Sequence, residues 1–416
     1  MNSYIEKFNN SIKNSIYYKL PKDSQEFIKQ KSFDFKFTFS EIKQIIDIAR
    51  DLDMWNEKSI IDIFPEHDQK KVVIARLKKA YEALRAKPNS YENFELKNVA
   101  KEQKYSFKTE AKDGFGLGLC PVASEKTRCC NLLTLDAVES CGFDCSYCSI
   151  QSFYNQNTIT FDSSFADKLK NLNLDQNKTY HIGTGQASDS LMWGNREGVL
   201  DALFLFAKEN PNVILEFKTK SDNISYFLEN EIPKNILCTW SLNTPTIIEN
   251  EEHLAASLDK RINAARAVAD RGAKVGFHFH PIVEYENYLN EYKSVYDRLL
   301  SEFNANEVAL VSFGTLTFIK PVIKQLRDRE FKSKITQMPF EDANGKSSYP
   351  DSTKVEMFKH AYESFKPWSK DVFFYLCMEE HEMWSKTFGY QYTTNNDFES
   401  AMLSAYAKKL GMEFLI

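Results

Sequence analysis

Six short apolar runs, each followed by a helix-like pattern, recur along the middle of this 416-residue chain. Strands that alternate with helices form parallel sheets with right-handed crossovers, so the sequence predicts an α/β fold, either an open sheet or a curled partial barrel. The expected strands are 131–137, 179–184, 213–219, 236–242, 274–280 and 307–313. The expected helices are 165–172, 198–208, 223–230, 258–272, 291–303 and 320–330.

The alternation of strand and helix patterns divides the chain into three expected regions. Residues 1–125 form a helical N-terminal region, in which 41–55 and 68–86 have apolar residues at helical spacing and Ser40 is the expected N-cap of the first of these helices. Residues 126–335 form the barrel. Residues 336–416 form a mixed extension with helices near 352–366 and 397–410 and an extra strand at 373–377.

Charge and composition narrow the class of protein. The net charge of −5 argues against a chain that is basic throughout, but residues 1–108 carry 21 Lys plus Arg against 16 Asp plus Glu. A basic N-terminal region could face a polyanion, although a solvated helical face is the simpler explanation. No leader and no apolar run of spanning length is evident, so we expect a cytoplasmic protein without a membrane partner.

Three of the eight cysteines crowd into the stretch ESCGFDCSYCSIQ at 139–151, directly after the first expected strand. The carboxyl ends of parallel strands share one rim, where the loops of such folds build their sites. Cys141, Cys145 and Cys148, spaced C-x3-C-x2-C, can ligate three irons of a 4Fe-4S cluster and leave the fourth iron open. The alternative is a closed zinc site with one further ligand.

The motif CGFDCSYC and several later segments resemble the radical S-adenosylmethionine (SAM) superfamily and, within it, the spore photoproduct lyase family. The later segments are ASDS in 182–190, the lysine of FKTK, WSLN at 240–243 and LDKRINAARAVADRGAKVGF at 258–277. The resemblance implies a partial (β/α)6 barrel of the TIM type, a 4Fe-4S cluster and SAM. It also implies reductive cleavage of SAM to a 5′-deoxyadenosyl radical, hydrogen abstraction from a substrate, and flavodoxin or ferredoxin as electron donor.

The resemblance also implies roles for particular residues. Cys141, Cys145 and Cys148 are similar to the cluster ligands. Ser188 and Asp189 resemble residues near the amino group of SAM, Lys220 resembles a lysine that contacts its carboxylate, and Ser241 and Asn243 resemble polar neighbours. All lie at or after the carboxyl ends of expected strands, and a zwitterionic ligand needs a cation and hydrogen-bond acceptors of this kind.

The chain departs from the lyases at the hydrogen donor. Gln186 occupies the place of their donor cysteine, and an amide cannot donate hydrogen atoms as a thiol can. Tyr147, inside the motif, is retained. Cys377 is a candidate replacement donor, with a buried thiol in the core as the alternative.

Other motifs left open questions. Cys120, Cys129 and Cys130 are candidates for a second metal site, but their irregular spacing argues against it. His278 and His280 alternate on one strand and share a face, where they are either acid–base groups in the barrel or structural histidines.

The expected function is therefore a radical SAM enzyme related to the lyases that repair a thymine dimer in DNA. A DNA substrate agrees with a basic stripe of Lys71, Lys78 and Arg85, which is expected on the outer face of the helix at 68–86. A small metabolite, nucleoside or peptide is the rival substrate, which Gln186 favours. A metal-cluster protein without turnover is the alternative from another class.

Overall fold

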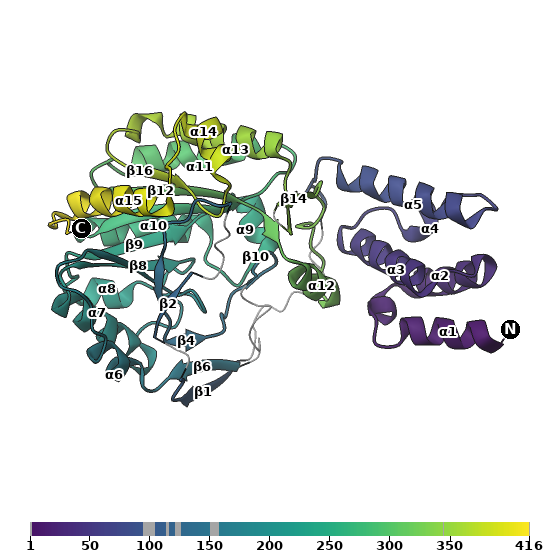
Figure 1. Ribbon diagram of the computed structural model, residues 1–416, viewed down its shortest axis with the longest axis horizontal. Coiled ribbons are helices and arrows are strands. Elements are labelled where there is room, and N and C mark those ends of the chain that lie inside the picture. Colours follow the sequence, from purple (N-terminus) through teal and green to yellow (C-terminus); the bar gives the residue numbers. More distant parts are fainter. Residues whose placement is uncertain are drawn as a thin grey trace. The chain divides into compact units, whose positions relative to one another are not determined.

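The computed structural model of the protein describes residues 2–94, 105–113, 116–120, 126–149, 158–343 and 345–415 (Figure 1). Two compact units make up the chain. The first is a helical unit of Met1–Ala100, Glu284–Glu286 and Thr317–Tyr349. The second, the sheet unit, consists of Lys101–Val283, Asn287–Leu316 and Pro350–Ile416.

The helical unit is built around one central helix, α3. It contacts α1, α2, α4 and α12, and its inward face carries Ile42, Ile45 and Leu52, each almost fully buried. A three-stranded antiparallel sheet in the order β13-β15-β14 completes the unit. The helices are α1 (Asn2–Ile12), η1 (Ile16–Lys19), α2 (Lys22–Phe35), α3 (Phe39–Met54), α4 (Ile60–Ile63), α5 (Lys70–Arg85) and α12 (Lys320–Asp328), and the strands are β13 (Thr317–Phe318), β14 (Glu341–Ala343) and β15 (Lys346–Ser348).

Two details of this unit differ from the sequence-based expectation. Helix α3 begins after Thr38, not Ser40, because Thr38 and Glu41 form a reciprocal capping box. Arg85 does not line up with the exposed Lys71 and Lys78, because its guanidinium lies 3.9 Å from the ring centroid of Phe340 and the residue is only 9% exposed. The outward basic stripe of α5 therefore ends before Arg85.

An eight-stranded sheet forms the core of the second unit, in the order β16-β12-β11-β9-β8-β7-β3-β2. Every neighbouring pair is parallel except β2 and β3. Strands β9 and β12 are buried along their whole length, as expected for a parallel sheet covered on both faces. The strands are β2 (Leu117–Leu119), β3 (Leu133–Leu135), β7 (Tyr180–Thr184), β8 (Val213–Thr219), β9 (Ile236–Ser241), β11 (Lys274–Ile282), β12 (Val308–Thr315) and β16 (Phe373–Leu376).

Helices and short strands surround this sheet (Figure 1). Helix α10 packs on β9 and β11, α13 packs on β12, and α15 lies along β12 and β16. Strands β1, β6 and β4 form a small separate sheet, and β5 pairs with β10. The helices are α6 (Phe165–Lys170), η3 (Arg196–Gly198), α7 (Val199–Glu209), α8 (Ser225–Glu229), α9 (Pro245–Glu251), α10 (Leu258–Asp270), α11 (Tyr288–Glu302), α13 (Asp351–Ser364), η4 (Lys366–Trp368), α14 (His381–Phe388) and α15 (Asn395–Leu410), and the short strands are β1 (Ser106–Glu110), β4 (Val138–Glu139), β5 (Asp144–Cys145), β6 (Thr158–Asp162) and β10 (Glu252–His253).

The predicted mixed α/β fold is confirmed, but its repeat differs from six strand–helix units. The parallel run has a seventh strand, because β16 pairs with β12. The helix expected to follow β12 is present as α12 but belongs to the helical unit, where it contacts α3. Helix α13 instead follows in the sheet unit and leads toward β16.

The two ends of the sheet are linked by a short segment that precedes β3. Thr127 forms an isolated antiparallel bridge with Glu380, and Arg128 N–H donates to the carbonyl of Glu379 at 3.1 Å. Glu379 in turn accepts from Lys354 and Thr315 through its side chain. Because Glu379 and Glu380 follow β16 while Thr127 precedes β3, these bonds curl the sheet toward closure.

Among the helices that the structure describes, none combines the length and apolar character needed to cross a membrane.

Close packing in the middle of the sheet makes a stability prediction. A Cβ added at Gly276 on β11 would lie 2.7 Å from Leu310 Cγ and 2.9 Å from Thr239 Cγ2. We expect Gly276→Ala to destabilise the protein by about 1–3 kcal/mol through overpacking and Leu310→Ala to cost about 2–5 kcal/mol through a cavity. In Gly276→Ala/Leu310→Ala the contact with the Leu310 side chain is removed and only the one with Thr239 Cγ2 remains, so the double variant should lose less than the two single losses together. Chemical denaturation of the four proteins measures this, and additive losses would contradict the steric explanation.

Candidate active site

The loop that carries the three motif cysteines follows β3 and is anchored to the segment after α9. Cys145 lies in β5, where it pairs with Glu252 of β10. Ser146 N–H donates to the carbonyl of Glu251 at 2.8 Å, and Cys148 N–H donates to the carbonyl of Cys145 at 3.1 Å. The backbone thus turns between the second and third cysteines, which keeps them close together.

The first part of the loop is held from the turn after β7. Ser188 Oγ donates to the carbonyl of Ser140 at 2.8 Å, directly before Cys141. A Cβ at Gly142 would lie 2.3 Å from Met192 Cε and within 3 Å of the Trp193 ring. Glycine is therefore required at this position so that the loop can approach the 188–193 segment.

The three thiols lie close enough together to affect one another's charge. Burial raises the pKa of Cys141 well above its usual value, and the charges of Asp189, Cys148 and Cys145 raise it further. Burial raises the pKa of Cys145 to about 12, against the opposing effect of Lys220. A metal ion would reverse this preference, because it binds the thiolate form.

The donor set fits an iron–sulfur cluster by its chemistry: three soft sulfur ligands on one short loop. In the described part of the chain, no three Cys, His, Asp or Glu side chains are already arranged around one point to hold a metal ion.

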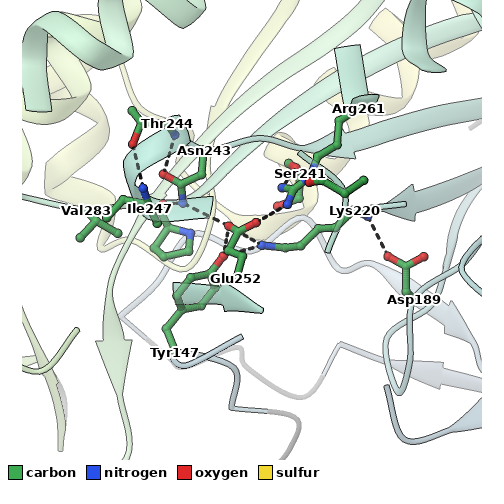
Figure 2. Close-up of polar contacts among 12 residues, drawn as sticks. Tyr147, Asp189, Lys220, Ser241, Asn243, Thr244, Ile247, Glu252, Arg261 and Val283 are labelled. Atoms are coloured by element: carbon green, nitrogen blue, oxygen red, sulfur yellow. Dashed lines mark hydrogen bonds and ion pairs between the residues drawn. The ribbon is translucent and has the colours of Figure 1, made fainter. Parts of the chain in front are cut away.

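Four side chains in or beside the loop bind the carboxylate of Glu252 through hydrogen bonds or ion pairs (Figure 2). We call this group the Glu252 cluster; it consists of Tyr147, Lys220, Asn243, Glu252 and Arg261. Lys220 Nζ lies 2.8 Å from Glu252 Oε1, and Arg261 Nη2 lies 2.6 Å from Oε2. Tyr147 donates its hydroxyl proton to Oε1, and Lys220 donates to that hydroxyl oxygen. Asn243 Nδ2 also donates to Oε1, at 3.3 Å.

These partners explain how a fully buried carboxylate stays charged. Burial alone raises the pKa of Glu252, but the charges of Arg261 and Lys220 outweigh it and lower the pKa to about 2. Arg261 is itself fully buried and donates to the carbonyls of Ala256 and Ser241 at 2.7 and 2.9 Å. The cluster therefore joins β5 and β10 to the ends of β8 and β9 and to α10.

Asp189 lies at the same rim, and its side chain is used by the chain itself. Its Oδ1 accepts from Thr219 Oγ1 at 2.7 Å and from the backbone N–H groups of Leu191 and Met192 at 3.0 Å. Its Oδ2 accepts from Lys220 N–H at 2.7 Å. Asp189 thus fixes the backbone at the end of β8, where Lys220 begins.

Asn243 is used in a similar way. Its amide donates to the carbonyl of Pro281 at 3.1 Å, and its carbonyl accepts from Thr244 N–H and Tyr292 OH. Ser241 contributes its backbone carbonyl to Arg261. The structure therefore brings Asp189, Lys220, Ser241 and Asn243 to one rim, as the sequence predicted, but most of their polar atoms bind the protein itself.

Of the three predicted catalytic residues, only Tyr147 belongs to the Glu252 cluster. Gln186 is half-buried in the turn after β7, where its backbone N–H and that of Ala187 bind Asp136.

Cys377 follows β16, and its N–H donates to the carbonyl of Phe313 at 2.8 Å. Burial raises the pKa of its thiol to about 12, and the nearby Cys120 and Cys129 raise it as well. A hydrogen bond from Cys130 lowers the pKa of Cys129 to about 6. Cys120, Cys129, Cys130 and Cys377 thus lie near one another.

Sequence reasoning missed Glu252 and Arg261. A usable signal existed for Arg261, because it lies on the apolar face of α10, beside Ile262, Ala265 and Val268, which are all fully buried. A charged residue at an inward helical position needs a buried partner. Glu252 gave no comparable signal. It stands among three consecutive polar residues, EEH at 251–253, and the sequence does not distinguish which of them pairs with Arg261.

The family model described as spore photoproduct lyase matches residues 96–362 of the chain. The chain belongs to the spore photoproduct lyase family. It is 24% identical to a spore photoproduct lyase of Clostridium acetobutylicum over 179 residues. These aligned residues make up 42% of this chain and 53% of that protein. It is 32% identical to the Bacillus subtilis enzyme over 85 residues, which cover 20% of this chain and 25% of that protein. The chain thus spans about half the length, or less, of these curated relatives.

Solved structures of the family have a similar fold. One spore photoproduct lyase variant, with bound AdoMet and dinucleoside spore photoproduct, aligns with a TM-score of 0.55 at 18% identity, over 65% of this chain and 82% of that chain. Another, in complex with dinucleoside spore photoproduct, aligns with the same TM-score at 17% identity and the same coverage of both chains.

The buried charge of Glu252 makes a pH prediction. Because its pKa is depressed in the folded state, its stabilising contribution is complete above the ordinary value of 4.5 and is lost as the pH falls toward about 2. Glu252→Gln leaves Arg261 without its carboxylate and should cost about 3–5 kcal/mol near neutral pH. The variant should also lose less stability than the parent between pH 4.5 and 2.

Glu249→Gln is the matched control, since Glu249 is exposed on α9. Urea unfolding of the three proteins at several pH values measures both effects. Parallel pH profiles for Glu252→Gln and the parent would refute the assignment.

Proposed function

We propose that the chain is a radical SAM enzyme that acts on a pyrimidine lesion in DNA. The observation that carries this proposal is the placement of the cysteine triplet. Cys141, Cys145 and Cys148 follow β3, at the rim of a curled parallel sheet, and Cys145 pairs with Glu252 of β10, which binds Lys220. Membership of the spore photoproduct lyase family supports the same chemistry.

On this proposal the sheet is a partial barrel of the radical SAM kind, and the cysteines hold a 4Fe-4S cluster. With SAM bound there, the cluster supplies the electron that generates a 5′-deoxyadenosyl radical. A flavodoxin or ferredoxin is the proposed electron donor.

The side chains of the rim have distinct proposed tasks. Lys220 is the cation available to the SAM carboxylate, because its side chain is 15% exposed while the side chain of Glu252 behind it is fully buried. Asp189 and Asn243 position β8 and β9, since their oxygens already accept hydrogen bonds from the chain. Ser188 holds the cysteine loop through Ser140. Glu252 balances the charges of Lys220 and Arg261 when SAM is absent.

A small metabolite, nucleoside or peptide is the second candidate substrate. Gln186 favours it, because an amide replaces the thiol expected in a lyase. The burial of Arg85 against Phe340 also shortens the basic stripe that would meet DNA.

The cluster assignment predicts a sharp difference among cysteine variants. Cys141→Ala, Cys145→Ala and Cys148→Ala should each lose bound iron and release no 5′-deoxyadenosine after anaerobic reconstitution. Cys238→Ala is the control, because Cys238 is fully buried in β9, outside the loop. Iron content, electronic absorption and chromatography of the nucleoside products measure the outcome. Bound zinc in place of iron, or 5′-deoxyadenosine release by Cys145→Ala, would disprove the assignment.

The DNA proposal predicts salt-dependent binding through α5. If the exposed Lys71 and Lys78 neutralise phosphates, Lys71→Glu/Lys78→Glu should weaken binding to irradiated DNA and reduce the slope of log affinity against log salt by about two. Lys22→Glu/Lys29→Glu on α2 is a charge-matched control at exposed positions. Fluorescence anisotropy at several salt concentrations measures it, and absence of binding at low salt would favour the small-substrate alternative.

A further inference from the structure

A hydrogen-bonded chain of five buried or half-buried side chains runs across the inner face of the sheet, apart from the Glu252 cluster. Glu216 on β8 lies 2.7 Å from His181 Nε2 on β7 and 2.7 Å from His278 Nε2 on β11. His278 Nδ1 lies 2.6 Å from Ser312 Oγ on β12, and Ser312 Oγ lies 2.9 Å from His280 Nε2. Four strands thus contribute to one continuous chain that ends at His280.

The protonation of this chain follows from its partners. A carboxylate only accepts hydrogen bonds, and Glu216 stays ionised because hydrogen bonds from His181 and His278 offset its burial and hold its pKa well below the usual value. His278 therefore presents Nε2–H to Glu216. Burial lowers the pKa of His278 to about 4, so the ring is neutral and its Nδ1 is bare.

Because His278 Nδ1 carries no proton, the proton positions of Ser312 and His280 follow. Ser312 Oγ donates its proton to His278 Nδ1, so it must accept from His280 Nε2–H. The pKa of His280 also lies well below its ordinary value, through burial and the charges of Lys218 and His278. His280 is therefore neutral, with its proton on Nε2 and a lone pair on Nδ1. No described residue hydrogen-bonds to this Nδ1 in the structure.

His280 lies at the rim where the proposed substrate must bind. Strand β9 lies between β8 and β11. Thr239 of β9 pairs with Lys218 on one side and with Gly276 on the other, so these three residues are at the same level of the sheet. Side chains two residues apart on a strand share a face, so Glu216 and Lys218 face the same side of β8, and Lys220 follows directly after the strand. His280 is half-buried and four residues beyond Gly276, toward the carboxyl end of the sheet. The absence of a side chain at Gly314 leaves room for its ring, 3.3 Å from where a Cβ would be.

We propose that His280 is a substrate-contacting residue whose Nδ1 accepts a hydrogen bond from an imide N–H, such as that of a thymine ring. An imide edge has an N–H between two carbonyl oxygens, so it needs an acceptor beside hydrogen-bond donors. His280 provides the acceptor, and the ammonium group of Lys218, whose charge acts on His280, provides a donor. This inference rests on the proposed action on a pyrimidine lesion.

The remaining members of the chain are positioning residues. Without Ser312, the His280 ring could carry its proton on either nitrogen, and an Nδ1–H would repel the imide N–H. A charged carboxylate inside the sheet costs more free energy than an apolar side chain would. Its role here is to accept hydrogen bonds from the histidine rings beside it and so to fix the proton on His278 Nε2.

The tautomer is tested first, in the protein without added cofactor. Long-range 1H–15N correlation spectra of the histidine rings should show His280 protonated on Nε2 in the parent and as a mixture of tautomers in Ser312→Ala. Ser312→Thr keeps the hydroxyl and should restore the parent spectrum. The ring signals of His360, on α13, are the internal control. An Nδ1–H signal for His280 in the parent, or an unchanged spectrum in Ser312→Ala, would overturn the inference.

Recognition is tested by binding of dinucleoside spore photoproduct and of its analogue methylated at the imide nitrogens. The parent should prefer the unmethylated compound by about tenfold, the value of one good hydrogen bond, and His280→Ala should lose this preference. His280→Gln retains an acceptor and should keep part of it, and His360→Gln should behave as the parent.

The outcomes separate the two proposals. Binding of both compounds with equal affinity by the parent overturns the role of His280 alone. Failure of the parent to bind either compound, in a protein that releases 5′-deoxyadenosine, overturns the pyrimidine substrate and the imide contact together, while the tautomer measurement still decides the hydrogen-bonded chain.

Discussion

The site depends on one buried carboxylate. Glu252 has no access to solvent, and it is charged only because Arg261 and Lys220 compensate it from α10 and the end of β8. Its own backbone pairs with Cys145, so the same residue ties the cysteine loop to the sheet. Removing the charge would leave a fully buried guanidinium unpaired, which is among the most costly defects in a protein interior. The loop, the rim lysine and the helix α10 are therefore one electrostatic unit.

A second buried carboxylate, Glu216, organises the inner face of the sheet in a different way. Its partners are His181, His278 and Thr239, which can each donate a hydrogen bond to it, so the contact with His278 fixes which ring nitrogen of that histidine carries the proton. The two systems meet on β8, where Glu216 and Lys218 share one face and Lys220 follows directly after the last residue of the strand. One strand thus connects the rim proposed for SAM with the interior proposed for the substrate.

The sequence predicted the secondary structure well where local pattern decides it. All six expected strands are present, and the triplet CGFDCSYC marked the loop. Prediction failed where a distant partner decides. Arg85 has an outward position by periodicity but packs on Phe340, more than 250 residues away in the chain. Helix α12 has a clear helical pattern, yet nothing in that pattern indicates that it contacts α3 rather than the sheet.

By itself the sequence determined the strand–helix alternation, the cysteine spacing and the chemical character of the rim, because periodicity and ligand spacing are local properties. Only the tertiary structure decided which polar atoms remain available. Asp189 and Asn243 resemble ligand-binding residues in sequence, but their oxygens accept hydrogen bonds from the chain's own backbone and from Thr219 and Tyr292. The sequence also does not show which residues bind Glu252 and Glu216, because the partners of a buried polar group are those that the fold brings within hydrogen-bonding distance.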